Sequence, residues 1–219
     1  MSYSNQKVYL IHGYGSSTLL LKSIENYLKK NGFETVNYSY HSIRDDIRKT
    51  GHNLYNQIKQ DRIDTVSFVT HSMGALVMRA LLTYSIKDSS FPTIYRIVMI
   101  TPPNHGTEIA DFFSSSSIFK FFLGPNVENM KTDSNSLANR LPLPLKSQVG
   151  IIVGEKSDST GYNPFIKGSN DGYVTPDEAK LGMEKDFRII YKSHTLITQS
   201  KKTRRLVLSF LRNGTFGKK

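Results

Sequence analysis

The chain has 219 residues, the length of one large domain or, less commonly, of two small ones. Its composition, 38% hydrophobic and 21% charged, is typical of a globular protein and excludes wholesale disorder. The chain contains no cysteine, which excludes disulfides, thiolate catalysis and cysteine-based zinc sites. The formal net charge of +11 is the one unusual value, and it indicates nucleic acid, an anionic membrane or an acidic substrate as classes of partner.

Targeting signals are not evident in the sequence. No apolar run is long enough for a transmembrane helix. The first residues lack a basic segment followed by an apolar stretch, so no secretory signal is predicted. We therefore expect a cytoplasmic protein, with secretion as the alternative.

Short apolar runs alternate with amphipathic stretches from the N-terminus onward. The apolar runs predict six strands, at Lys7–Ile11, Phe33–Ser39, Thr65–Val69, Ile94–Ile100, Val149–Val153 and Phe187–Tyr191. The helical spacing of apolar residues predicts helices at Leu19–Lys30, Ile43–Ile58, Gly74–Tyr84 and Thr195–Arg212. This alternation predicts an α/β fold, in which a mostly parallel, six-stranded sheet has helices on both faces, within a single domain over residues 1–219.

A long segment between the fourth and fifth predicted strands, residues 108–146, interrupts the alternation. It is rich in phenylalanine and contains four consecutive serines. Because open α/β sheets hold their sites in loops beyond the carboxyl ends of the strands, we expect this insertion to form a short cap or lid over a site. Its aromatic rings either line a substrate-binding wall or complete the core. The candidate substrate-binding residues are Phe112, Phe113, Phe121 and Phe122.

The most informative segment is T-H-S-M-G at residues 70–74, between the third strand and the helix that begins at Gly74. A serine hydroxyl is a weak nucleophile unless it is exposed and close to a base. A tight strand–serine–helix turn provides such a position for Ser72. The usual pattern is G-x-S-x-G, and Thr70 replaces its first glycine here. On this segment alone, Ser72 as a plain helix N-cap is the alternative.

Three further segments favour catalysis. The first strand ends in H-G-Y-G, where glycine allows the Tyr14 N–H to face the nucleophile and to form an oxyanion hole with the Met73 N–H. Asp171 lies in N-D-G-Y-V after the fifth strand, and His194 follows the sixth. The chain order of Ser72, Asp171 and His194 is the order expected for a catalytic triad in this type of fold.

Together these segments resemble the α/β-hydrolase superfamily, in particular bacterial triacylglycerol lipases and small esterases. The similar pieces run in the same order over nearly the whole chain: V-Y-L-I-H-G-Y-G, H-S-M-G-A-L-V-M-R, I-T-P-P-N-H-G-T-E-I-A-D, N-D-G-Y-V and S-H-T-L-I. The resemblance implies that Ser72 is the nucleophile, Asp171 the acid and His194 the base. It implies a serine hydrolase that cleaves carboxylic esters through an acyl-enzyme. Thr70 and an extra proline in Thr101–Asn104 depart from the family pattern.

The acid of the triad has alternatives. Asp158 follows the fifth strand more closely, and Asp177 is a third candidate. We favour Asp171 because N-D-G-x-V is the lipase-like form. The chemistry requires no cofactor, and no acidic pair is assigned to a metal.

Several other polar residues have structural interpretations. His71 is expected to point away from the neighbouring nucleophile, and His12 and His105 are expected to hold loops by hydrogen bonds. Arg79 and Asp111 occupy positions similar to those of the family, where we expect a structural ion pair.

The resemblance implies a small-molecule or lipid ester as substrate. A thioesterase or acyltransferase acting on lipid-linked acyl groups is the alternative enzyme, and a catalytically inactive hydrolase scaffold is the alternative without activity. The basic residues of the last helix form a solvated face without a nucleic-acid-binding motif, so no nucleic-acid partner is expected. The same face could instead assist docking on an anionic membrane surface.

Overall fold

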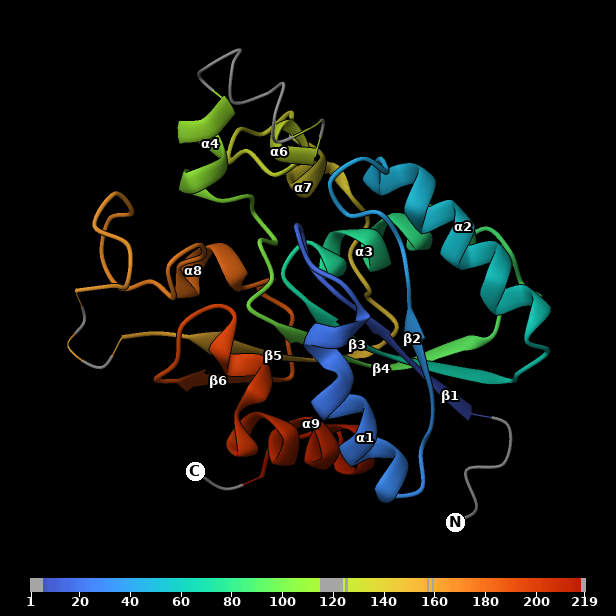
Figure 1. Cartoon of the computed structure of the whole chain (residues 1–219). Helices are drawn as coiled ribbons and strands as arrows, with labels where there is room; N and C mark the ends of the chain where they lie inside the picture. Colours follow the sequence, from blue (N-terminus) through green and yellow to red (C-terminus); the bar gives the residue numbers. More distant parts are fainter. Residues whose placement is uncertain (1–5, 115–123, 125, 157, 159, 218–219) are drawn as a thin grey trace.

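Six strands form one sheet in the computed structural model, which describes residues 6–114, 124, 126–156, 158 and 160–217 (Figure 1). The strands are β1 (Gln6–Ile11), β2 (Glu34–Tyr38), β3 (Thr65–His71), β4 (Thr93–Ile100), β5 (Gln148–Gly154) and β6 (Asp186–Ile190). Their spatial order is β2-β1-β3-β4-β5-β6, and every neighbouring pair is parallel. The predicted six-stranded parallel sheet is confirmed. Because the strand order reverses between β1 and β3, a crevice is expected beyond their carboxyl ends.

Helices cover both faces of the sheet. The longer ones are α1 (Lys22–Lys30), α2 (Ile47–Gln60), α3 (Gly74–Ser85) and α9 (Lys201–Asn213). The shorter ones are η1 (Thr18–Leu21), α4 (Glu108–Ser114), α6 (Asn126–Asn129), α7 (Leu137–Arg140), α8 (Pro176–Ala179) and η2 (Leu196–Gln199). α1 and α9 lie against one face, and α2 and α3 lie against the other (Figure 1).

The two layers of helices produce two apolar clusters that share the sheet. Along β1, Val8 and Leu10 belong to the cluster under α1 and α9. Tyr9 and Ile11 belong to the cluster under α2 and α3. Successive side chains of a strand point to opposite faces, so a strand buried on both sides must be apolar throughout. This requirement explains why the central strands are continuous apolar runs in the sequence.

Three predicted helices begin later than their apolar spacing indicates. The helix predicted from Ile43 begins at Ile47, because the Asp46 carboxylate accepts hydrogen bonds from the first N–H groups of α2 and so acts as its N-cap. The helices predicted from Leu19 and Thr195 are each divided into a 3-10 turn, η1 or η2, and a following α-helix. η1 and η2 lie against each other.

The segment between β4 and β5 lies at the top of the view in Figure 1, where residues 108–146 were predicted to form a cap. α4 and α6 pack together there. The Asn126 side chain donates hydrogen bonds to the carbonyls of Ser42 (3.0 Å) and Asp45 (2.8 Å), which ties α6 to the loop between β2 and α2. The assignment of residues 108–146 as a cap or lid stays a prediction.

The predicted ion pair between Arg79 and Asp111 is wrong. Arg79 is buried on α3, and its guanidinium donates to the backbone carbonyls of Asn104 (2.9 Å), Leu141 (2.7 Å) and Pro142 (3.2 Å). The Asp111 carboxylate instead accepts from the Thr132 N–H and hydroxyl. Burial lowers the pKa of Arg79 to about 10, still far above neutral pH. Arg79 therefore fastens the segment between β4 and β5 to α3 through the backbone.

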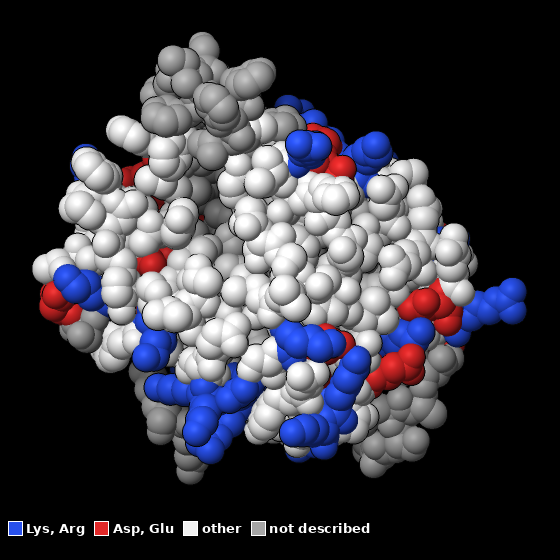
Figure 2. Space-filling view, in the orientation of Figure 1, with Lys and Arg blue, Asp and Glu red and all other residues white. Residues whose placement is uncertain are grey.

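Basic side chains gather over α1 and α9, at the bottom of the view in Figure 2. The two helices carry Lys22, Lys29, Lys30, Lys201, Lys202, Arg204, Arg205 and Arg212. Their apolar side chains, such as Phe210, face the sheet, so the positive charge lies on the solvent side. Among the described residues, every helix falls short of the length and apolarity needed to cross a membrane.

Candidate active site

Ser72 lies in a sharp turn that joins β3 to α3. Its φ of 51° is in the left-handed region, which is uncommon for a residue with a side chain. The Ser72 N–H donates to the Ile100 carbonyl of β4 at 2.9 Å, which fixes the turn to the neighbouring strand. A Cβ at Gly74 would lie 2.3 Å from the Ile11 carbonyl oxygen. Glycine at position 74 is therefore required by the close approach of α3 to β1.

The loop after β1 packs directly against Ser72. A Cβ at Gly13 would lie 2.7 Å from the Ser72 Cβ, so only glycine allows this approach. Tyr14 follows and lines the same cavity as Ser72. The Met73 N–H, at the start of α3, has no acceptor in the part of the chain that the structure describes. Backbone N–H groups in such positions can stabilise an oxyanion beside a serine.

Asp171 and His194 form a buried pair. The distance between His194 Nδ1 and Asp171 Oδ2 is 2.8 Å, and the His194 N–H donates to the Asp171 carbonyl at 2.9 Å. The other carboxylate oxygen of Asp171 accepts from the N–H groups of Tyr173 (3.0 Å) and Val174 (2.9 Å). A proton on His194 Nδ1 then faces the carboxylate, which leaves Nε2 free to accept a proton.

The alternative acids lie elsewhere. Asp158 pairs with Lys156 at 2.9 Å, and hydrogen bonds from Lys156 and Thr160 lower the pKa of Asp158 to about 2. Asp177 is exposed and pairs with Lys180 at 2.8 Å. Within the described ranges, the carboxylate that contacts the His194 ring is that of Asp171.

A cavity of about 490 Å³, here called the Ser72 cavity, is lined by both Ser72 and His194. The Ser72 hydroxyl makes no hydrogen bond to His194 in the described chain, and such contacts commonly tighten only when substrate binds. Much of the remaining wall is apolar, formed by Leu20, Ile109, Ala110, Phe113, Val127, Met130 and Val174. The site thus places Ser72 and His194 beside a largely apolar chamber.

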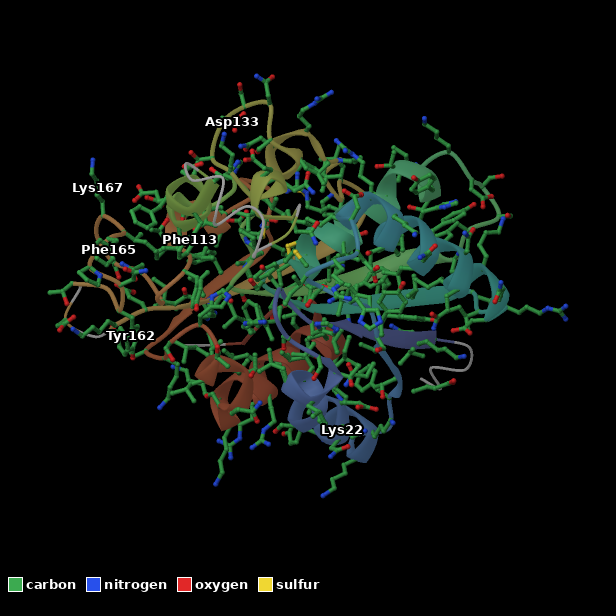
Figure 3. The ribbon with its side chains drawn as sticks, turned by 45° about the horizontal axis from the view of Figure 1, so that its top comes forward. Lys22, Phe113, Asp133, Tyr162, Phe165 and Lys167 are labelled. Carbon is green, nitrogen blue, oxygen red and sulfur yellow. The ribbon has the colours of Figure 1, made fainter. Side chains whose placement is uncertain are left out.

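The four candidate phenylalanines are placed differently. Phe113 lines the Ser72 cavity. Phe112 is 55% exposed, and its ring stacks on that of Phe165 at 6.0 Å. Figure 3 shows Phe113 and Phe165 on the same side of the molecule, from α4 and from the loop after β5. Phe121 and Phe122 lie outside the described residues.

His71 takes part in this site in a way that the sequence did not indicate. It is buried, its Nε2 lies 2.9 Å from the His194 carbonyl oxygen, and the two rings are 4.8 Å apart. A carbonyl only accepts, so the proton of a neutral His71 lies on Nε2. Burial, together with the nearby His194, lowers the pKa of His71 to about 3. His71 is therefore a neutral donor that links the residue before Ser72 to the loop of His194.

The remaining histidines near the site hold loops. His12 Nδ1 lies 3.0 Å from the Gly13 carbonyl oxygen, and its ring stacks on Tyr40 at 4.3 Å. His105 Nδ1 lies 3.1 Å from the Asn139 side-chain oxygen. In the described residues no cluster of three acidic, cysteine or histidine side chains could hold a metal ion.

Solved structures similar to this one include lipases and esterases. The mature lipase BlEst2 of Bacillus licheniformis has a TM-score of 0.73 at 19% identity, over 97% of this chain and 93% of that chain. A metagenomic carboxyl esterase has a TM-score of 0.64 at 15% identity, over 93% and 72%. A carboxylesterase of Nitrososphaera gargenis has a TM-score of 0.62 at 13% identity, over 96% and 91%. The chain therefore has the α/β-hydrolase fold.

A family model described as "Domain of unknown function (DUF7379)" matches residues 3–126, more than half of the chain, and the protein belongs to this family. No curated protein sequence matches the chain.

Proposed function

We propose that the protein is a serine hydrolase of carboxylic esters, with Ser72 as nucleophile, His194 as base and Asp171 as acid. The observation that carries this proposal is the 2.8 Å contact of Asp171 with His194, which lines the same cavity as Ser72. A serine in a strained turn, beside a histidine oriented by a carboxylate, is the arrangement that activates a hydroxyl for attack.

The proposed reaction proceeds in two steps through an acyl-enzyme. His194 Nε2 removes the proton of the Ser72 hydroxyl as its oxygen attacks the ester carbonyl, and Asp171 stabilises the imidazolium that forms. The N–H groups of Tyr14 and Met73 hold the oxyanion. His194 then protonates the leaving alcohol, and a water molecule repeats the sequence to release the acid.

A labelling experiment tests this assignment. A fluorophosphonate probe should label the native protein and leave Ser72→Ala unlabelled, and p-nitrophenyl ester hydrolysis should be lost in the same variant. Ser67→Ala is the matched control, because Ser67 is buried in β3, the strand that leads to Ser72, and lies outside the Ser72 cavity. Labelling that persists in Ser72→Ala would reject the assignment, and a native protein without labelling would favour an inactive scaffold.

The chemical class of the ester separates the main enzyme alternatives. Thioesterases and acyltransferases use the same triad, so a panel of oxygen esters, thioesters and glycerides distinguishes them. Support for an acyl chain comes from the apolar wall around Phe113. We expect turnover of p-nitrophenyl esters to rise from acetate to medium chains. A strict preference for acetate, unchanged in Phe113→Ser, would contradict an acyl-binding wall.

We also propose that the mouth of the Ser72 cavity docks on an anionic lipid surface. Leu19 on η1 and Leu196 on η2 are 77% and 60% exposed, and their neighbours Leu20 and Thr195 line the cavity. Exposed basic residues follow in the first turns of the adjoining helices, namely Lys22, Lys201 and Lys202. Apolar side chains flanked by cations suit a membrane with anionic headgroups.

Vesicle sedimentation tests the docking surface. Binding should increase with the fraction of anionic lipid and should decrease in the double variant Lys201→Gln/Lys202→Gln. The control is Lys87→Gln/Lys49→Gln, which removes the same charge from lysines outside α1 and α9. Binding that is independent of both lipid charge and salt would refute the proposal.

A further inference from the structure

A second cavity of about 520 Å³ adjoins the Ser72 cavity. The two cavities share Gly15 and Ser16, which follow Tyr14 in the loop after β1. The opposite wall of the second cavity is the loop between β2 and α2, residues 39–45. A substrate whose carbonyl lies between Ser72 and the Tyr14 N–H would therefore reach this second cavity by extending past Gly15 and Ser16.

The second cavity, here called the polar cavity, differs in chemistry from the Ser72 cavity. Its lining includes hydroxyl groups, one imidazole, one guanidinium and one carboxylate, from Ser16, Ser17, Ser39, Tyr40, His41, Ser42, Arg44 and Asp45. Arg44 is exposed and forms no ion pair with any acidic side chain in the described part of the chain. Its charge is available to a ligand.

The two carboxylates that follow Arg44 in the chain accept hydrogen bonds from backbone N–H groups. Asp45 Oδ2 accepts from the His41 N–H at 2.9 Å, which closes the loop on itself. Asp46 Oδ1 accepts from the N–H groups of Arg48 and Lys49 as the N-cap of α2. Both carboxylates keep their negative charge but face backbone N–H groups of the loop and of α2, so the cation in the described lining that an incoming anion would contact is Arg44.

Hydrogen bonds hold the walls of the polar cavity in place. The Ser16 N–H donates to Ser42 Oγ at 3.3 Å, and the Ser42 hydroxyl donates back to the Ser16 carbonyl at 3.4 Å. The Tyr40 hydroxyl donates to the His12 carbonyl at 2.6 Å, next to the glycine that packs on Ser72. The cavity is thus tied to the turn that carries the proposed nucleophile, and a pre-formed site loses less entropy on binding.

We propose that the polar cavity binds a phosphate group on the alcohol part of the ester, while the acyl chain occupies the Ser72 cavity. A guanidinium forms paired, charge-assisted hydrogen bonds with phosphate oxygens, and the hydroxyls of Ser16, Ser17 and Ser39 supply further donors. The substrate class is then an acylated, phosphorylated alcohol of the acylglycerol phosphate type. This inference rests on the proposed hydrolase function, because it assigns the substrate of the same serine.

The test compares two substrates with the same acyl chain, a 1-acylglycerol and a 1-acylglycerol 3-phosphate, both in micelles of neutral detergent. The native protein should have the higher kcat/KM for the phosphate. Arg44→Gln should lower kcat/KM for the phosphate by at least about tenfold and change the neutral substrate by less than about twofold. The matched control is Arg48→Gln, an exposed arginine on α2 outside the cavity lining, which should leave both substrates unchanged.

Three outcomes would overturn the inference. The first is that Arg44→Gln changes kcat/KM for both substrates equally or for neither. The second is that Arg48→Gln has the same effect as Arg44→Gln, which would indicate an effect of surface charge. The third is that the native protein has the higher kcat/KM for the neutral ester. If a substrate with a distal carboxylate in place of the phosphate were turned over equally well, the polar cavity would select anions in general and not phosphate. Failure of the hydrolase proposal is distinguishable, because Ser72 would then resist the fluorophosphonate and neither substrate would be cleaved.

Discussion

Replacement of His71 by leucine should impair catalysis while the fold persists. His71 precedes Ser72 in the chain, and its side chain donates to the backbone carbonyl of His194 at 2.9 Å. The contact joins residues separated by 123 positions, so it would set how the proposed base approaches the proposed nucleophile. Leucine is apolar and of similar volume, and it removes the donor. Glutamine places an amide donor at nearly the reach of Nε2 and should restore the contact.

The size of the effect follows from what still holds His194. Two contacts to Asp171 remain, from the His194 N–H at 2.9 Å and from its ring at 2.8 Å. The lost bond leaves a buried carbonyl unpaired, which costs about 1–3 kcal/mol of stability. A shift of the imidazole by about 1 Å reduces the rate by about 10²-fold. We expect kcat to fall by between about 10-fold and 10²-fold in His71→Leu, with KM nearly unchanged.

The assay measures kcat and KM for a p-nitrophenyl ester, with active sites counted by fluorophosphonate titration so that unfolded protein does not contribute. His71→Gln should recover most of the native kcat. The positioning role would be refuted if His71→Leu kept the native kcat, or if the glutamine variant lost as much activity as the leucine variant. A loss confined to thermal stability, with kcat per titrated site unchanged, would indicate a structural role alone.

Three further predictions concern the triad, the turn and acid stability. Asp171→Asn should lower kcat by about 10³–10⁴-fold with little change in KM, since the asparagine favours the wrong imidazole tautomer; steady-state kinetics at fixed pH would show it. Gly74→Ala should destabilise the protein by about 1–3 kcal/mol in urea unfolding, because its Cβ would meet the Ile11 carbonyl at 2.3 Å. Burial lowers the pKa of His71, to about 3, and of His12, so both bind protons more readily when unfolded. The free energy of unfolding should therefore reach its full value above about pH 6.5 and should fall below that pH by up to about 1.4 kcal/mol per pH unit for each histidine. Urea unfolding of the native protein and of His71→Gln at pH 7 and at pH 5 measures how much of this fall is due to His71.

The sheet was predictable because its physical requirements act on short stretches of chain. A central parallel strand is buried on both faces, so β4 contains the apolar run Ile97–Ile100, which stands out from its surroundings. The helix starts were harder to predict. Apolar spacing extends the second helix back to Ile43, whereas the position of the Asp46 cap decides where α2 begins.

The candidate site was predictable to the extent that its chemistry imposes a local pattern. The turn at Ser72 tolerates only glycine at position 74, and this requirement produces the recognisable motif H-S-M-G in the sequence. The role of Arg79 was not visible, because its partners are backbone carbonyls, which every residue possesses. The contact of His71 with His194 was hidden for the same reason. The polar cavity was not visible because it forms between the loop after β1 and the loop between β2 and α2, which lie apart in the sequence.

Two groups of positive side chains contribute to the net charge of +11, and their proposed roles should differ in their dependence on salt concentration. Lys22, Lys201 and Lys202 are exposed on α1 and α9, and the proposed attraction to a membrane would act over a Debye length of about 8–10 Å at ordinary ionic strength. At about 1 M salt that length falls to about 3 Å, so vesicle binding should be largely lost. Arg44 would act on a phosphate at hydrogen-bond distance, where screening is weaker. The preference for the phosphorylated ester should therefore outlast membrane binding as salt is raised. If both declined together, the preference would derive from the overall field of the protein and not from Arg44.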